Sequence, residues 1–211
     1  MWRTRSLILG FFAIIGIQAR TNRDDTTPSV AERFLGYAVA PLVMRGAIEP
    51  GGDEMSFNGT EIDAQIRQLK PDFSWDDFQP AMPATAKAPR NVHGKRTWQK
   101  VLCHVQNLPS ASRDSIEANY AFLYKIATPI SAPGGRQCTQ ASCKAGAAVW
   151  FCNDNLSWHG EESLVIGDYV HHITGTKECE DAGNNEMVQG QVFDTEGWNV
   201  IVNGDSSCTS P

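Results

Sequence analysis

The sequence of 211 residues predicts an α+β fold in which two helices pack on one antiparallel sheet, in the order β-α-β-β-α-β-β, stabilised by disulfides. Three observations lead to this prediction. All six cysteines lie after residue 96. Two segments of the same part of the chain carry apolar residues at helical spacing. Short apolar segments bounded by turn residues flank both of them, so the folded unit is expected within residues 97–211.

The first three elements follow one another closely. The stretch "WQKVLCHVQN" alternates as a strand does, with Val101, Cys103 and Val105 on one side. The next stretch, "DSIEANYAFLYKIA", spaces its apolar residues for one helical face, and Ser112 is placed to cap this helix at its N-terminus. Two short strands are expected around Gly146 in "ASCKAGAAVWFCND".

The remaining elements complete the order. The stretch "ESLVIGDYVHHITG" repeats its apolar residues at helical spacing, and Gly175 is suited to end the helix. The stretch "EMVQGQVFDTEGWNVIVNG" then predicts a closing hairpin, with strands near 187–193 and 198–203 and a turn at 195–197. Two amphipathic helices and these strands bury their apolar faces best in two layers.

The N-terminus predicts export. Residues 1–19 contain Arg3 and Arg5, then an apolar run over 7–17, then Ala19, which is the layout of a secretory signal peptide. The run is too short to span a bilayer, and no later apolar run is long enough to anchor the protein. We therefore expect a secreted, extracellular protein without a membrane anchor.

Export changes how the cysteines are interpreted. An even number of cysteines in an oxidising compartment indicates disulfides, and six of them allow fifteen pairings among which the sequence does not choose. No C-x-x-C pair is present, so no zinc site is predicted. The six expected disulfide cysteines are Cys103, Cys138, Cys143, Cys152, Cys179 and Cys208.

Residues 20–96 differ in composition from residues 97–211. They contain no cysteine and end in "QPAMPATAKAPRNVHGKR", which is rich in proline and poor in large apolar residues. One short helix is expected in "GTEIDAQIRQLKPDF", ended by Pro71, and the rest is expected to be largely disordered. Lys95 and Arg96 form a dibasic site for a kexin-type protease, so 20–96 are interpreted as a pro-segment and 97–211 as the mature domain.

The charge of the mature domain argues against nucleic-acid binding. Residues 97–211 carry 6 Lys and Arg against 13 Asp and Glu, a net of −7, whereas the preceding residues carry 12 against 11, a net of +1. Binding to a phosphate backbone needs clustered cations, which an acidic domain of this kind does not supply.

The histidines are the natural candidates for catalysis. His159 and Glu161 lie in one polar segment, and His171 and His172 are neighbours in the second helix. Adjacent helical residues point about 100° apart, and no established catalytic motif surrounds these side chains. Structural histidines are the preferred interpretation, and a secreted nuclease-like hydrolase using His159, Glu161 and His171 is the alternative.

Three further features concern the surface. Trp158 lies in a polar loop, where an exposed aromatic side chain would favour protein contact. Asn155 and Asn58 each begin an N-glycosylation sequon. The run 153–155 could offer calcium ligands, but it lacks the rest of a calcium loop, so a turn is the preferred interpretation and no metal is expected.

The stretches "VWFCNDN", "IGDYVHHI" and "GQVFDTEGWNVIV", with a cysteine between the last two, resemble a pattern found in small cysteine-rich proteins secreted by filamentous fungi, several of them effector candidates. The segment is also loosely similar to KP4-type killer toxins. The resemblance covers roughly residues 100–203 and departs from the pattern at 162–165, where a cysteine is expected, so no disulfide map is carried over.

This resemblance implies a secreted effector or toxin-like protein that acts by binding a host or competitor protein. It implies no catalytic residue and no cofactor, and we expect a monomer. An inhibitor of a secreted enzyme is a further alternative.

Overall fold

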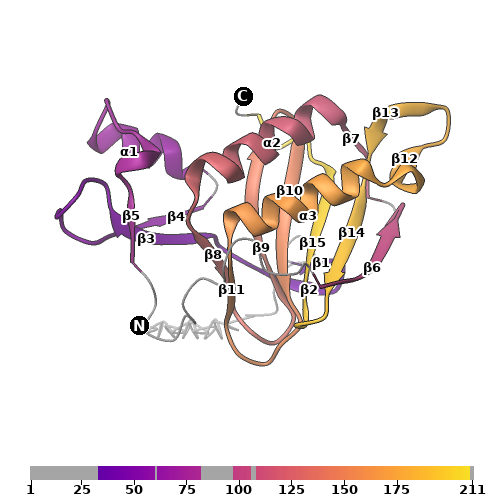
Figure 1. Ribbon diagram of the computed structural model, residues 1–211, viewed down its shortest axis with the longest axis horizontal. Coiled ribbons are helices and arrows are strands. Elements are labelled where there is room, and N and C mark those ends of the chain that lie inside the picture. The colour runs from indigo at the N-terminus through magenta and orange to yellow at the C-terminus, as the bar shows by residue number, and fades with distance from the viewer. Residues whose placement is uncertain (1–32, 60, 82–96, 106–107, 210–211) are drawn as a thin grey trace, which may run out of the picture.

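The computed structural model describes residues 33–59, 61–81, 97–105 and 108–209 (Figure 1). The predicted signal peptide, Lys95, Arg96 and most of the proline-rich segment lie outside these ranges. We call residues 33–59 and 61–81 the N-terminal unit, and residues 97–105 and 108–209 the C-terminal unit.

A seven-stranded sheet forms the centre of the molecule, in the order β1-β2-β9-β10-β15-β14-β6. All of its neighbouring strands are antiparallel except β2 and β9, which are parallel, so the prediction of an antiparallel sheet holds for the C-terminal unit but not for that pair. The strands are β1 Arg33–Phe34, β2 Tyr37–Ala40, β6 Trp98–Cys103, β9 Gln137–Lys144, β10 Ala147–Asn153, β14 Gly190–Asp194 and β15 Trp198–Gly204.

Two helices, α2 (Arg113–Ile126) and α3 (Ser163–Gly175), run side by side across one face of this sheet (Figure 1). Both were predicted from their apolar spacing. The side chain of Ser112 accepts a hydrogen bond from Ser115 N, which confirms it as the N-cap of α2. A Cβ at Gly167 would lie 2.8 Å from Tyr124 Cε2, so glycine lets the two helices approach closely.

Both faces of the sheet are covered. Every residue of β10 is buried, and successive side chains point to opposite faces. Val149 and Phe151 belong to the core beneath the helices, whereas Ala148 and Trp150 belong to a second apolar cluster on the far face. A strand buried on both sides explains the continuous apolar run in its sequence.

Three disulfides confirm that all six cysteines pair. Cys138–Cys152 joins the neighbouring strands β9 and β10. Cys103–Cys179 joins β6 to η3 (Lys177–Cys179), and Cys143–Cys208 joins β9 to the C-terminal segment. All three bonds lie within the C-terminal unit.

The N-terminal unit is folded over the residues described. It contains α1 (Ile62–Leu69), η2 (Trp75–Asp77) and a small sheet in the order β4-β3-β5. The predicted short helix is thus confirmed, while the expectation of disorder is wrong for residues 33–59 and 61–81, because their apolar side chains join a core shared with α2. The strands are β3 Val43–Ala47, β4 Met55–Asn58 and β5 Gln79–Pro80.

The predicted order β-α-β-β-α-β-β also needs correction within the C-terminal unit. The first strand of the expected closing hairpin is divided at Gln189, whose side chain accepts a hydrogen bond from Val105 N. Two small sheets were not predicted, β11-β8 and β12-β13-β7. Their strands are β7 Ala111–Ser112, β8 Pro129–Ala132, β11 His159–Glu162, β12 Glu180–Asp181 and β13 Asn184–Val188. Within the described residues, no helix is long and apolar enough to cross a bilayer.

Candidate functional site

The loop over residues 154–158, between β10 and β11, presents two large apolar side chains to solvent. Leu156 is 96% exposed and Trp158 is 63% exposed. These two residues lie two positions apart in one short loop, and among the described residues they are the most exposed of the large apolar side chains. The prediction that Trp158 is exposed agrees with its position here.

The backbone of this loop is held in place although its side chains are exposed. Asn153 anchors the start, since its Nδ2 donates to the carbonyls of Ala132 at 3.1 Å and Ser157 at 2.8 Å, and its Oδ1 accepts from Asn155 N at 2.9 Å. Gly135 N donates to the carbonyl of Asn155 at 2.7 Å. The polar run 153–155 therefore forms a hydrogen-bonded turn, as preferred from the sequence.

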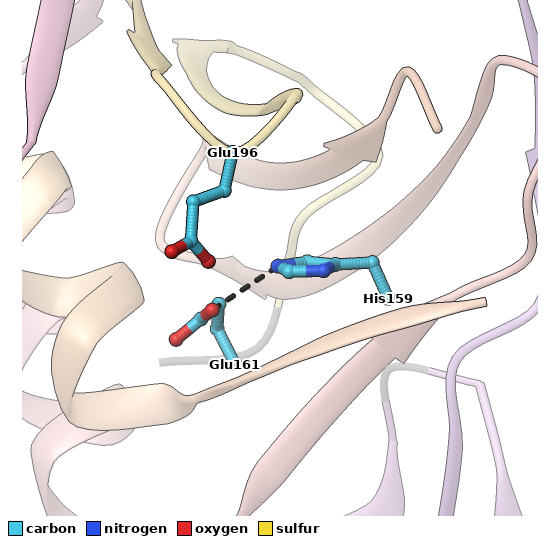
Figure 2. A group of neighbouring side chains, drawn as sticks. All are labelled: His159, Glu161 and Glu196. Carbon is cyan, nitrogen blue, oxygen red and sulfur yellow. Dashed lines mark hydrogen bonds and ion pairs between the residues drawn. The ribbon is translucent and has the colours of Figure 1, made fainter. Parts of the chain in front are cut away.

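His159, which directly follows the loop in the chain, belongs to a cluster of three ionisable side chains (Figure 2). His159 Nε2 lies 3.1 Å from Glu161 Oε1, and one ligating atom from each of His159, Glu161 and Glu196 lies within 4.8 Å of the others. All three side chains are partly buried. We call this group the His159 cluster.

Two different elements bring the His159 cluster together. Strand β11 pairs with β8, and residues two apart on a strand share one face, so His159 and Glu161 point the same way. The His159 ring packs against Phe151 and Trp198, with ring centroids 6.1 and 6.0 Å apart. Glu196 comes from the turn between β14 and β15.

That turn is fixed by hydrogen bonds to its backbone. Asp194 Oδ1 accepts from Glu196 N at 2.7 Å, and Asn155 Nδ2 donates to the carbonyls of Glu196 at 2.9 Å and Gly197 at 3.1 Å. Gly197 has φ +78°, and a Cβ there would lie 2.7 Å from Asn155 Oδ1. The turn thus requires glycine, and the 154–158 loop is coupled to Glu196 through Asn155.

Asp194 joins this turn to the helix layer. It is buried, and its Oδ2 accepts hydrogen bonds from Tyr169 of α3 and, at 2.7 Å, from Thr97 Oγ1. A buried carboxylate with this many donors is well satisfied, so the role of Asp194 is to hold the turn in place.

The acidic groups near the loop affect one another. Burial raises the pKa of Glu162, and the charge of the neighbouring Glu161 raises it further. Glu162 also stands at the N-terminal end of α3 without a side-chain capping hydrogen bond. The loop thus adjoins two glutamates of β11 and, through Asn155, the turn that carries Glu196, while Arg136 pairs with Asp154 of the loop itself.

The His159 cluster has the donor types of a transition-metal site, one imidazole and two carboxylates. Such ligands bind zinc at about 2.0–2.2 Å, so two donors on one ion can be separated by at most about 4.4 Å. The three ligating atoms lie within 4.8 Å of one another, a spread close to this limit, so they offer a candidate metal site that the sequence did not predict.

Helix α3 places His171 and His172, the other two candidate histidines, in a different patch. His171 packs near Tyr120, with centroids 5.7 Å apart, and His172 stacks on Trp98 at 3.8 Å. Burial lowers the pKa of His172, and the charge of His171 lowers it further. Of the predicted trio His159, Glu161 and His171, the structure brings together only the first two, and it adds Glu196.

The two sequons have different environments. Asn155 donates both of its side-chain hydrogen bonds to the 195–197 turn, so a glycan there would compete with the contacts that fix the turn. Asn58 lies exposed at the end of β4. Of the two predicted glycosylation sites, Asn58 is the more accessible in the folded chain.

The chain matches no protein-family model, no curated protein and no solved structure. Its function is therefore inferred from the residues themselves.

Proposed function

We propose that this protein is a secreted effector or toxin-like protein that binds a host or competitor protein through the 154–158 loop. The observation that carries the proposal is the pairing of Leu156 and Trp158, both well exposed, on a backbone fixed by hydrogen bonds. A loop that is already ordered loses little entropy on binding, and tryptophan is among the residues that contribute most to protein interfaces.

The surroundings of the loop suggest the chemistry of the partner. Glu161 and Glu196 belong to the His159 cluster, which begins directly after the loop, and the C-terminal unit is acidic overall. The partner surface that fits best has an apolar pocket for Leu156 and Trp158 with a basic rim. The three disulfides fit a protein that works in an oxidising compartment.

A pull-down tests this proposal. Purified protein is exposed to plant or competitor extracts as wild type, as the double variant Leu156→Ser/Trp158→Ala, and as Trp98→Ala, which removes another exposed tryptophan, 42% accessible, from β6. The double variant should lose the specific partner, with affinity reduced at least about 100-fold, while Trp98→Ala retains it. Equal recovery of the partner by wild type and double variant would reject the loop as the binding surface.

Secretion and processing belong to the same proposal. The order of signal peptide, cysteine-free segment, Lys95-Arg96 and cysteine-rich unit supports cleavage after Arg96. N-terminal sequencing of secreted protein should give a start at Thr97, and Lys95→Ala/Arg96→Ala should give a longer secreted chain. A wild-type protein that begins near Arg20 contradicts this part.

A secreted hydrolase is the second candidate, supported by the hydrogen bond between His159 and Glu161 beside Glu196. A carboxylate that orients an imidazole is a common arrangement for general base catalysis. Incubation with RNA, glycan and protein substrates, with and without Zn²⁺, tests it. Turnover that is lost in His159→Ala but kept in His171→Ala would favour the enzyme, because His171 lies outside the cluster. Absence of turnover on all substrates would reject it.

A further inference from the structure

The N-terminal unit contacts the C-terminal unit along the edge of the central sheet. Strand β2 pairs in parallel with β9, with Ala38 opposite Gln137, and Ala40 opposite Thr139. Ala38 N also donates to the carbonyl of Arg136 at 3.1 Å. The last strand edge on this side of the C-terminal unit is thus covered by residues that precede the proposed cleavage site.

A buried polar network reinforces this contact. Tyr37 is 4% exposed and lies in the apolar cluster on the far face of the sheet. Its hydroxyl donates to Asp154 Oδ1 at 2.9 Å and accepts from Asn199 Nδ2 at 3.1 Å. The guanidinium of Arg136 lies 5.1 Å from the Tyr37 ring centroid. Asn199 Nδ2 also donates to Asp154 Oδ2 at 2.9 Å, so removing Tyr37 would take one hydrogen bond from each of these two residues of the C-terminal unit and leave the bond between them.

A second contact joins the N-terminal unit to helix α2. Phe73, Trp75 and Phe78 pack edge-on around one another, and the Trp75 ring is 6.2 Å from Phe122 of α2. Trp75 Nε1 donates to Asp63 Oδ1 at 2.8 Å, so its one polar atom is satisfied. The aromatic group belongs to the same apolar core as the buried residues of α2, which makes the contact a continuation of the core and not a surface touch.

We infer that the N-terminal unit stays bound to the C-terminal unit after the chain is cut between them, so that the processed protein is a two-chain, noncovalent complex in which β2 covers the edge of β9. The contacts between the two units do not depend on the proposed cleavage. The two-chain complex forms in nature only where that cleavage takes place, and in this respect the inference rests on the proposed function. All six cysteines lie in the C-terminal unit, so no disulfide links the two chains.

The N-terminal unit is held by two contacts at different places on the C-terminal unit. Backbone pairing and Tyr37 hold it at β9, while the aromatic group holds it at α2. Releasing one contact leaves the other to keep the fragment near, so the effective concentration for rebinding stays high. Release of both would expose the β9 edge and the buried aromatic side chains to water together.

The test uses the full chain with Lys95-Arg96 replaced by the recognition sequence of a site-specific protease. The purified protein is cut completely and passed through a size-exclusion column without denaturant, and each peak is then run on a denaturing gel without reductant. The two fragments should elute together at the volume of the uncut chain and separate only on the gel. An N-terminal fragment that elutes alone overturns the inference, whatever the secreted protein shows about natural cleavage.

Two variants separate docking from folding. Trp75→Ala, cut in the same way, should weaken the complex roughly 100-fold and release the fragment on dilution. Leu69→Ala is the matched control, because Leu69 lies in α1 but is 57% exposed, and it should behave as the wild type. If Trp75→Ala is isolated only as aggregate, the cut wild-type complex is diluted in steps instead. A complex that stays intact below about 1 μM supports the inference, and one that dissociates at that concentration rejects it.

Discussion

The two units of this protein reach order by different means. The C-terminal unit has a sheet covered on both faces and three disulfides of its own. The N-terminal unit has no cysteine, one α-helix of eight residues and a three-stranded sheet, and its Trp75 packs against Phe122 of α2. The difference teaches that a segment with the composition of a linker can still be ordered when its neighbour supplies the rest of its core.

This contrast predicts that the two units respond unequally to mutation. Changes in the C-terminal unit should affect the whole protein, because the N-terminal unit depends on it. Changes in the N-terminal unit should loosen that unit while leaving the disulfide-linked part folded.

The largest effect should come from the disulfide with the longest loop. Cys103 and Cys179 are 76 residues apart, so replacing both with serine should lower the free energy of unfolding by about 4.5 kcal/mol. The matched pair Cys138 and Cys152, 14 residues apart, should cost about 3 kcal/mol. Denaturant unfolding followed by tryptophan fluorescence measures both. Two variants as stable as the wild type would show that the disulfides do not set the stability of this unit.

A buried apolar residue of the N-terminal unit should come next. Ile66 of α1 is fully buried, so Ile66→Ala should cost about 3 kcal/mol, compared with less than about 0.5 kcal/mol for the exposed Leu69→Ala in the same helix. Hydrogen exchange resolved by peptide should show faster exchange in residues 33–81 and little change in β10 and β15. Equal acceleration in both units would mean that they unfold as one.

The hydroxyl group of Tyr37 should have a smaller effect. Tyr37→Phe keeps the ring but removes the hydrogen bonds to Asp154 and Asn199, and it should cost about 1–2 kcal/mol. Thermal unfolding of the full chain measures the loss. Tyr124→Phe, on the partly exposed face of α2, is the comparison, and a larger loss there than at Tyr37 would contradict the importance of the contact between the units.

The smallest expected effect is a loss of stability in the N-terminal unit at low pH. Burial alone would raise the pKa of Asp63, but its hydrogen bonds with Arg67 and Trp75 and the positive charges of Arg67 and Lys125 outweigh burial and lower it. Because the folded pKa lies below the unfolded value of 3.8, the stabilisation is present above that value and is lost as pH falls through the folded pKa.

The N-terminal unit should therefore loosen first when the protein is acidified below about pH 4. Asp63→Asn should show less change in hydrogen exchange of α1 between pH 6 and pH 3 than the wild type does. Asp72→Asn, at an exposed position after α1, serves as the control and should follow the wild type. An unchanged acid response in Asp63→Asn would assign the effect to another group.

The parts of the fold that the sequence predicted are the longer ones. Helices α2 and α3 span 14 and 13 residues, which is long enough for apolar spacing to repeat over several turns. Strands β1, β2 and β5 have two to four residues, too few for any period to be visible. The parallel pairing of Ala38 with Gln137 joins residues far apart in the chain and depends on tertiary packing that no local pattern reports.

The candidate site was predicted only in part for a similar reason. His159 and Glu161 are close in sequence and share a strand face, so their association could be expected from alternation. The sequence predicted a turn that contains Glu196, but no local sequence pattern indicated that this turn would lie beside β11. His171 was selected for its chemistry, and its helix turns it toward Tyr120.

The network at Asp194 has a consequence for a chain that starts at Thr97. The carbonyl of Thr97 accepts from Thr195 N at 3.2 Å, and its hydroxyl donates to Asp194 at 2.7 Å. Six residues later, Cys103 is covalently fixed to Cys179. Aminopeptidases digest from a loose, extended N-terminus. An N-terminus at Thr97 would instead be hydrogen-bonded from its first residue. The new end that the proposed cleavage would produce should thus resist trimming by exopeptidases.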